Sequence, residues 1–312
     1  MNHPAWPEDL RVFDRGWLSS ANLLCLGDEP ALIDTSHVKD KEATVALMQD
    51  ALAGRSLARI AHTHLHSDHC GGTGALQAAW PEVQTWVPAA SLAAVRAWDD
   101  SAFNFRATGQ RCAPFGAEHA LDPGSSVRLG QRDWQIHPAP GHDPLAIFLF
   151  NADDRILVAG DALWERGVGI IFPQIEGSDD FEPFERTLQA IESLRPRWVV
   201  PGHGAAIAEA GGGIERAIAQ ARRRIAEFGA DPAYHALHAA RVMVKYQLMD
   251  AESMRLPDFW AWADGTAVLH QVQRQYWPEL DWRHWLDEQV LAPLLAKGQL
   301  RQDATHIRDV KA

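Results

Sequence analysis

The feature that most constrains the fold of this 312-residue chain is a dense run of histidines directly after the apolar residues 57–61. The apolar run predicts a buried strand, and side chains at positions i and i+2 of an extended chain point the same way. His64 and His66 can therefore face one metal ion, and a turn after them would direct Asp68 and His69 toward a second. Imidazole and carboxylate groups at this density predict a site for zinc or a related metal, rather than a His-rich loop that binds nothing.

Three further segments each place one ligand-type residue beside a glycine at the end of a predicted strand. They are Pro140-Gly141-His142, Ala159-Gly160-Asp161 and Pro201-Gly202-His203. Loops gather at strand ends, and functional sites are often built from them. The chemistry of the chain is therefore expected where these three strand ends meet the histidine run.

The rest of the chain predicts an α/β body followed by helices. Strands are expected at residues 10–13, 22–26, 31–34, 83–87, 127–129, 134–137, 146–150, 156–158 and 197–200, and helices at 39–52, 75–79, 88–97 and 181–194. Residues 98–122 show no clean period and are interpreted as a long loop or a broken helical insertion. After Gly211-Gly212-Gly213, helices are expected at 214–228, 232–249 and 282–295. We therefore expect two domains, residues 1–212 and 213–312.

Taken in order, the HxHxDH run followed by Gly-His, Gly-Asp and Gly-His resembles the signature of the metallo-β-lactamase superfamily, over roughly residues 10–210. The resemblance implies an αββα sandwich with a mainly helical C-terminal domain. That domain is expected to be either winged-helix-like or a set of helices without winged-helix geometry. It also implies two divalent metal ions, for which zinc is favoured over iron or manganese. The implied ligands are His64, His66 and His142 for the first ion, Asp68, His69 and His203 for the second, and Asp161 as the bridge between them.

Three carboxylates near these ligands carry further expectations. Asp34 matches the early strand-end aspartate of the family, which would orient a ligand histidine, and an ordinary turn aspartate is the alternative. Asp68 is the expected catalytic residue, because it can accept the proton of a metal-bridging hydroxide in addition to binding metal. Asp143 stands where the family often has Thr or Ser after the Gly-His, and it adds a carboxylate to the rim of the site.

Aromatic residues between the ligand segments are the candidate substrate contacts. They are Trp98, Phe103 and Phe105, with Arg106 beside them, in the insertion after the histidine run, and Trp164 and Phe172 in the loop after Asp161. The family places a lid over the metals at the position of the insertion. Aromatic walls with an arginine suit an acyl or carboxylate-bearing substrate, and ordinary packing is the alternative for each of these side chains.

The presence of Asp161 separates this chain from true β-lactamases, which lack the bridging carboxylate. The resemblance is closer to hydroxyacylglutathione hydrolase-like thioesterases, to lactonases and to winged-helix-tailed endoribonucleases. Residues 221–227 and 294–300 of this chain resemble parts of the tail of those endoribonucleases. It implies metal-dependent hydrolysis of a small-molecule ester, thioester or lactone. The alternatives are an endoribonuclease or phosphodiesterase, a persulfide dioxygenase with one iron held by His64, His142 and Asp161, and a non-catalytic binding module.

Composition bears on partners and location. The formal net charge is −12, and the whole acidic excess lies in residues 1–212, which argues against nucleic acid or an anionic membrane as partner. The N-terminal residues lack the basic and apolar regions of a secretory signal, and the three cysteines are scattered, so we expect a cytoplasmic protein. The tryptophans clustered in residues 260–285 suit core packing, a wall of the cleft or a homodimer contact.

Overall fold

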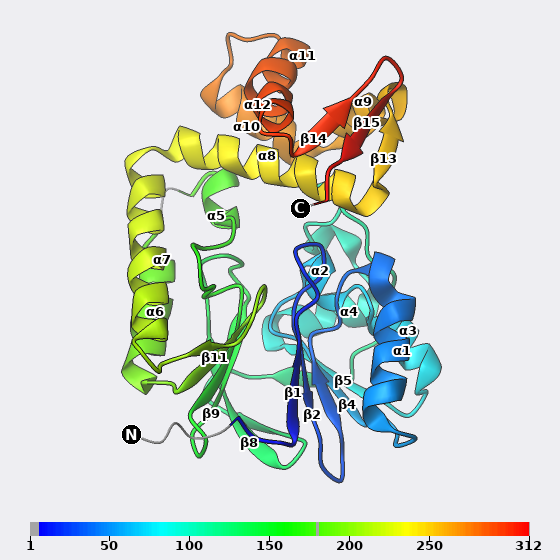
Figure 1. The fold of residues 1–312 in the computed structure, drawn as a ribbon, viewed down its shortest axis with the longest axis vertical. Coiled ribbons are helices and arrows are strands. Elements are labelled where there is room, and N and C mark those ends of the chain that lie inside the picture. Colours follow the sequence, from blue (N-terminus) through cyan, green and yellow to red (C-terminus); the bar gives the residue numbers. More distant parts are fainter. Residues whose placement is uncertain (1–5, 179–180, 312) are drawn as a thin grey trace.

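The computed structural model describes residues 6–178 and 181–311, and two six-stranded sheets packed face to face form its body (Figure 1). The first sheet contains, in spatial order, β1 (Leu10–Phe13), β2 (Asn22–Cys25), β3 (Ala31–Ile33), β4 (Arg59–Ala61), β5 (Gln84–Pro88) and β6 (His119–Leu121). The second contains β7 (Ser126–Leu129), β8 (Arg132–Pro138), β9 (Ile147–Asn151), β10 (Ile156–Gly160), β11 (Trp198–Pro201) and β12 (Ile207–Ala208). The α/β sandwich expected from the sequence is confirmed.

Alternation of side chains along the strands builds the layers of the core. On β2, Leu23 points into the space between the sheets, whereas Leu24 points to the helices outside. On β9, Leu149 lies between the sheets and Phe150 faces the outer helices of the second sheet. Each side chain buried in this way stabilises the fold by roughly 1.5–3 kcal/mol, so the two sheets are held to one another and to their helices.

Helices cover the outer face of each sheet. The first sheet carries α1 (Lys41–Leu52) and α3 (Thr73–Ala79), and the second carries α6 (Glu182–Leu194) and α7 (Gly213–Ala230). The shorter helices are η1 (Val38–Asp40), α2 (Ser67–Cys70), η2 (Ala89–Ser91), α4 (Leu92–Ala97), η3 (Asp100–Ala102) and α5 (Phe172–Ile175). This order of helix, sheet, sheet and helix is the αββα arrangement that the resemblance implies.

Beyond α7 the chain forms a mainly helical layer with an apolar cluster of its own, as expected. Its helices are α8 (Pro232–Ala251), α9 (Leu256–Gly265), α10 (Ala267–Tyr276), α11 (Trp282–Trp285) and α12 (Ala292–Ala296), with a π-helical segment over Leu286–Leu291, and its strands are β13 (Ser253–Arg255), β14 (Leu300–Gln302) and β15 (His306–Asp309). The cluster includes Phe259 and Trp285, and Phe172 of the body packs into it. The domain boundary at residue 212 stays a prediction. Helix α7, which follows that boundary in the chain, packs on the second sheet of the body.

Residues 98–122 differ in part from the expected loop or broken helix. Residues 119–121 form β6, which pairs in parallel with β5 and extends the first sheet. A three-residue strand is too short for its apolar alternation to be visible in the sequence. Among the residues that the structure describes, no helix combines the length and the apolar character needed to cross a membrane.

Candidate metal centre

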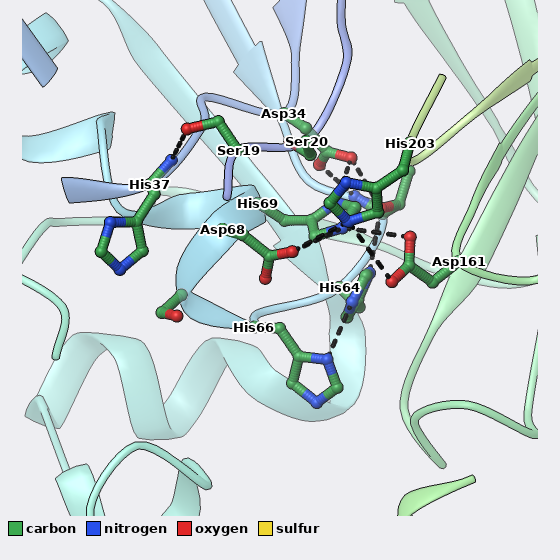
Figure 2. A network of polar contacts seen from close by, with 12 residues as sticks. Ser19, Ser20, Asp34, His37, His64, His66, Asp68, His69, Asp161 and His203 are labelled. Atoms are coloured by element: carbon green, nitrogen blue, oxygen red, sulfur yellow. Dashed lines mark hydrogen bonds and ion pairs between the residues drawn. The ribbon is translucent and has the colours of Figure 1, made fainter. Parts of the chain in front are cut away.

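The seven ligand-type residues come from strand ends that lie on one edge of the sandwich. β3 and β4 are parallel, so the chain leaves both at the same edge of the first sheet, and the run from His64 to His69 follows β4. In the second sheet β8, β10 and β11 run in one direction, and they are followed by His142, Asp161 and His203. The two edges meet, and the structure brings all seven side chains together in two adjoining groups. Figure 2 labels all of them except His142.

Three imidazoles form the first donor group. His66 Nδ1 lies 3.1 Å from His64 Nε2 and 2.8 Å from His142 Nε2. A ring nitrogen carries at most one proton. His66 Nδ1 therefore cannot form hydrogen bonds with the lone pairs of both His64 Nε2 and His142 Nε2 at once. One cation between them would satisfy all three lone pairs, so this group fits a metal ion.

The second donor group consists of Asp68, His69, Asp161 and His203. Asp68 Oδ2 lies 3.0 Å from His203 Nε2, and Asp161 Oδ1 lies 3.3 Å from His69 Nε2. His69 Nε2 is buried and has no hydrogen-bond partner among the described residues, which is the condition expected of a metal-facing nitrogen. Asp161 also faces the first group, since its Oδ2 lies 3.3 Å from His142 Nε2. Asp161 is therefore placed as the bridging carboxylate would be, although its role as a ligand stays a prediction.

In His142, His203 and His69 the nitrogen on the far side of the ring is held in a hydrogen bond. His142 Nδ1 donates to the Ile170 carbonyl at 2.6 Å, and His203 Nδ1 donates to the Gly16 carbonyl at 3.3 Å. His69 Nδ1 donates to the carboxylate of Asp34 at 2.8 Å. These bonds fix the proton on the outer nitrogen and leave the inner lone pair free for a metal, as is usual for metal-binding histidines.

Burial sets the charge of the first group. Burial lowers the pKa of His66 and of His142 to about 4, and it lowers the pKa of His64 well below its usual range. These imidazoles are therefore neutral at pH 7, which is the form that binds metal. In the second group burial also disfavours the charged form of His69, but the surrounding carboxylates, Asp161 first, outweigh it and raise the pKa of His69. The carboxylates thus create a strong local preference for positive charge.

Asp34 joins both donor groups. Its Oδ2 accepts from His69 Nδ1 at 2.8 Å and from the Thr63 hydroxyl at 2.8 Å, and Thr63 Oγ1 in turn lies 3.2 Å from His64 Nδ1. Burial raises the pKa of Asp34, but its histidine neighbours, His69 first, outweigh burial and hold that pKa below its usual range. Asp34 is thus placed where an orienting aspartate would lie, and its role as one stays a prediction.

We expect Asp34→Asn to weaken metal binding by about 10 to 100-fold while the fold is retained, because the amide group keeps the size of the side chain but removes its charge. The affinity for zinc, measured by calorimetric titration of the metal-free protein, checks this. Asp50→Asn, on the exposed face of α1, is the matched control. An unchanged affinity in Asp34→Asn would show that the aspartate has no orienting role.

The candidate substrate contacts fall into two sets. Trp98, Phe103 and Phe105 pack against one another in a cluster that also contains Leu65 and Cys70. By contrast, the Phe172 ring lies 4.7 Å from the ring of His66, and Trp164 Nε1 donates to Asp161 Oδ1 at 3.0 Å. Arg106 is exposed. A role in substrate binding stays a prediction for each of these residues, and Trp164 and Phe172 are the ones that contact ligand-type side chains.

Sequence reasoning missed two residues beside the centre. Trp17 is 61% exposed, and its ring lies 5.7 Å from the ring of His203 and 5.6 Å from that of Trp164. The feature of the sequence that could have pointed to Trp17 is its place directly after a glycine, between two predicted strands. Tyr246 comes from α8 and donates its hydroxyl hydrogen to the Leu18 carbonyl at 3.0 Å. Nothing in its local sequence points to the metal centre.

The fold and the donor set define a protein of the α/β sandwich type with a candidate metal centre at one edge of its sheets. The chain belongs to the metallo-beta-lactamase superfamily, whose family profile matches residues 14–203, a range that contains all seven donors. Among solved structures, the metallo-beta-lactamase family protein TTHA1429 from Thermus thermophilus covers 98% of this chain and 100% of its own, with a TM-score of 0.56 and 18% sequence identity. At this identity the likeness shows the fold alone, and it includes the C-terminal region.

Similar proteins include two hydroxyacylglutathione hydrolases. The one from Anaeromyxobacter dehalogenans is 30% identical over 252 residues, 77% of this chain and 87% of that enzyme. The one from Bdellovibrio bacteriovorus is 31% identical over 144 residues, 46% of this chain and 47% of that enzyme, so the chain spans about half of its length. The human acyl-coenzyme A thioesterase MBLAC2 is 26% identical over 181 residues, 55% of this chain and 63% of that enzyme.

Proposed function

We propose that the protein hydrolyses small-molecule thioesters, and that esters and lactones are related substrates. The reaction would use two divalent metal ions, for which zinc is favoured over iron or manganese. The observation that carries the proposal is the convergence of seven donors into two groups that share Asp161. His64, His66 and His142 would hold one ion, and Asp68, His69 and His203 the other. The thioester-cleaving relatives support the choice of thioesters over phosphodiesters.

Metal ions held there would polarise the substrate carbonyl and bring the pKa of a coordinated water to about 7. Burial disfavours the charge of Asp68, but His69 and His203 outweigh it and hold the pKa of Asp68 at about 2. Asp68 is therefore a carboxylate at neutral pH, and Oδ2 can accept the proton that the attacking water loses. Trp164 fixes Asp161 through the hydrogen bond from Nε1, and Phe172 covers His66 and His142 with an apolar ring.

We also propose that nucleic acid is not a partner. The Arg222-Arg223-Arg224 triplet is the basic run of the C-terminal region, and two of its members are engaged by acidic side chains. Arg222 binds Glu185 and Glu192, and Arg224 binds Glu227. A nucleic-acid surface needs arginines that are open to phosphate. A cytoplasmic location, supported by the three free cysteines, and a homodimer are further proposals.

The test is a substrate screen with the full chain, stripped of metal and then loaded with zinc, manganese or iron in separate samples. The substrates are acyl-glutathione and acyl-coenzyme A thioesters, a homoserine lactone, bis(p-nitrophenyl) phosphate, single-stranded RNA and a glutathione persulfide with oxygen uptake as readout. Elemental analysis gives the number of ions bound per chain.

We expect the highest kcat/KM for a thioester or lactone with two zinc ions per chain. Faster cleavage of RNA or of the phosphodiester would overturn the proposal in favour of a nuclease. Oxygen uptake by a one-iron form, without thioester hydrolysis, would identify a persulfide dioxygenase. A protein that binds two ions and turns over none of these substrates would favour the binding module.

A further inference from the structure

Helix α8 is the part of the C-terminal layer next to the body, and it lies across the ends of both sheets (Figure 1). Its C-terminal half makes polar contacts with separate segments of the body. Lys39 Nζ donates to the Met249 carbonyl at 2.8 Å, and Arg111 donates two hydrogen bonds of 2.7 Å to the carboxylate of Asp250. These contacts hold the helix against the side of the body that carries the metal centre.

Tyr246 of α8 reaches the loop beside the second donor group. Its hydroxyl donates to the Leu18 carbonyl at 3.0 Å. The edge of its ring meets the ring of His37 at 5.7 Å. The hydroxyl of Tyr246 therefore joins α8 to the segment of the body that contains Leu18.

The loop that contains Leu18, residues 14–21, holds the second donor group from one side. The Gly16 carbonyl accepts from His203 Nδ1 at 3.3 Å, and the Ser20 amide donates to the Asp68 carbonyl at 3.0 Å. Figure 2 shows Ser20 close to this group, near His203. The partner of the Tyr246 hydroxyl, the Leu18 carbonyl, thus belongs to a loop that contacts both Asp68 and His203.

The first donor group is held by other partners. His142 Nδ1 donates to the Ile170 carbonyl, and His64 Nδ1 contacts the Thr63 hydroxyl. Neither partner belongs to the loop of residues 14–21, which is the segment that the Tyr246 hydroxyl contacts. Loss of the Tyr246 hydroxyl should therefore loosen one donor group and leave the other in place.

We propose that Tyr246 is a positioning residue for the second donor group, so that the C-terminal region sets the affinity for one of the two ions. The inference rests on the two-metal site of the proposed function but not on the identity of the substrate. It gives the C-terminal region a part in assembling the metal centre.

The test compares Tyr246→Phe with Tyr234→Phe in the full chain. Both variants remove one hydroxyl from α8, but Tyr234 is 39% exposed and its hydroxyl contacts Arg224 on the surface. Zinc is titrated into metal-free protein by calorimetry, and cobalt loading is followed by its visible absorption. We expect Tyr246→Phe to weaken one of two binding steps by about tenfold, the lower end of the effect of partners that orient metal ligands. The other step, and both steps in Tyr234→Phe, should match the wild type.

Two unchanged binding steps in a folded Tyr246→Phe would overturn the inference, and so would an equal loss in both steps, which indicates a general structural role. If Tyr246→Phe does not fold, Tyr246→Met also removes the hydroxyl, with an adaptable apolar side chain, and should weaken the same single step; two unchanged steps there would refute the inference. A wild-type protein that binds fewer than two ions would refute the two-metal site itself. That result is distinct, because it appears before any variant is compared.

Discussion

Asp161→Ala should remove at least one of two bound metal ions and abolish thioester hydrolysis. Asp161 faces both donor groups, with Oδ1 3.3 Å from His69 Nε2 and Oδ2 3.3 Å from His142 Nε2. We expect kcat/KM to fall by more than about 100-fold, since loss of partners that only orient a ligand already costs about 10 to 100-fold. Ions per chain by elemental analysis and hydrolysis of an acyl thioester are the measurements.

The matched control is Asp153→Ala, which removes an exposed carboxylate from the turn between β9 and β10. It should bind two ions and retain wild-type activity. Full activity of Asp161→Ala with two ions bound would show that the site assignment is wrong. Activity lost with both ions retained would leave Asp161 in the reaction but remove it from the ligand set.

Gly202→Ala should disrupt the same carboxylate by steric means. A Cβ atom on Gly202 would lie 1.9 Å from Asp161 Oδ1, 2.9 Å from His69 Cε1 and 3.0 Å from the carbonyl carbon of Gly160. The neighbours include backbone, and Gly202 is itself held by a 2.7 Å hydrogen bond to the Gly160 carbonyl, so the carboxylate must move. We expect loss of metal and a decrease of about 1–3 kcal/mol in the free energy of unfolding, as for other overpacked sites.

Gly265→Ala at the end of α9 is the control for this substitution, because a Cβ there meets nothing within 4 Å. Its metal content and thermal midpoint should equal or slightly exceed those of the wild type. Thermal unfolding with and without zinc separates the two consequences of Gly202→Ala. Stabilisation by zinc equal to that of the wild type would contradict the expected displacement of Asp161.

The sequence predicted the parts of the metal centre that depend on local geometry. His64 and His66 follow an apolar strand at i, i+2 spacing, so their common direction could be inferred from the chain itself. That His142, Asp161 and His203 join them depends on how two sheets pack, and there the family resemblance supplied the expectation. The structure agrees, since all of these side chains meet at one edge of the sandwich.

Features set by contacts between distant segments could not be read from the sequence. Phe103 and Phe105 are buried together, but an aromatic residue in an insertion has the same sequence signal whether it lines a pocket or fills a core. Tyr246 reaches Leu18 only because α8 crosses the ends of the sheets. Strands β6, β14 and β15 have three or four residues each, too few for a pattern of alternation to stand out.

The division of the donors between the two sheets has a consequence for biosynthesis. Each donor group takes residues from the run after β4 and from strand ends of the second sheet, so neither half of the sandwich contains a complete group. During synthesis of the nascent chain, the first group lacks a member until residue 142 has been made, and the second until residue 203. Because both groups depend on the packing of the two sheets, capture of metal by either full set of donors should follow the folding of the second sheet onto the first.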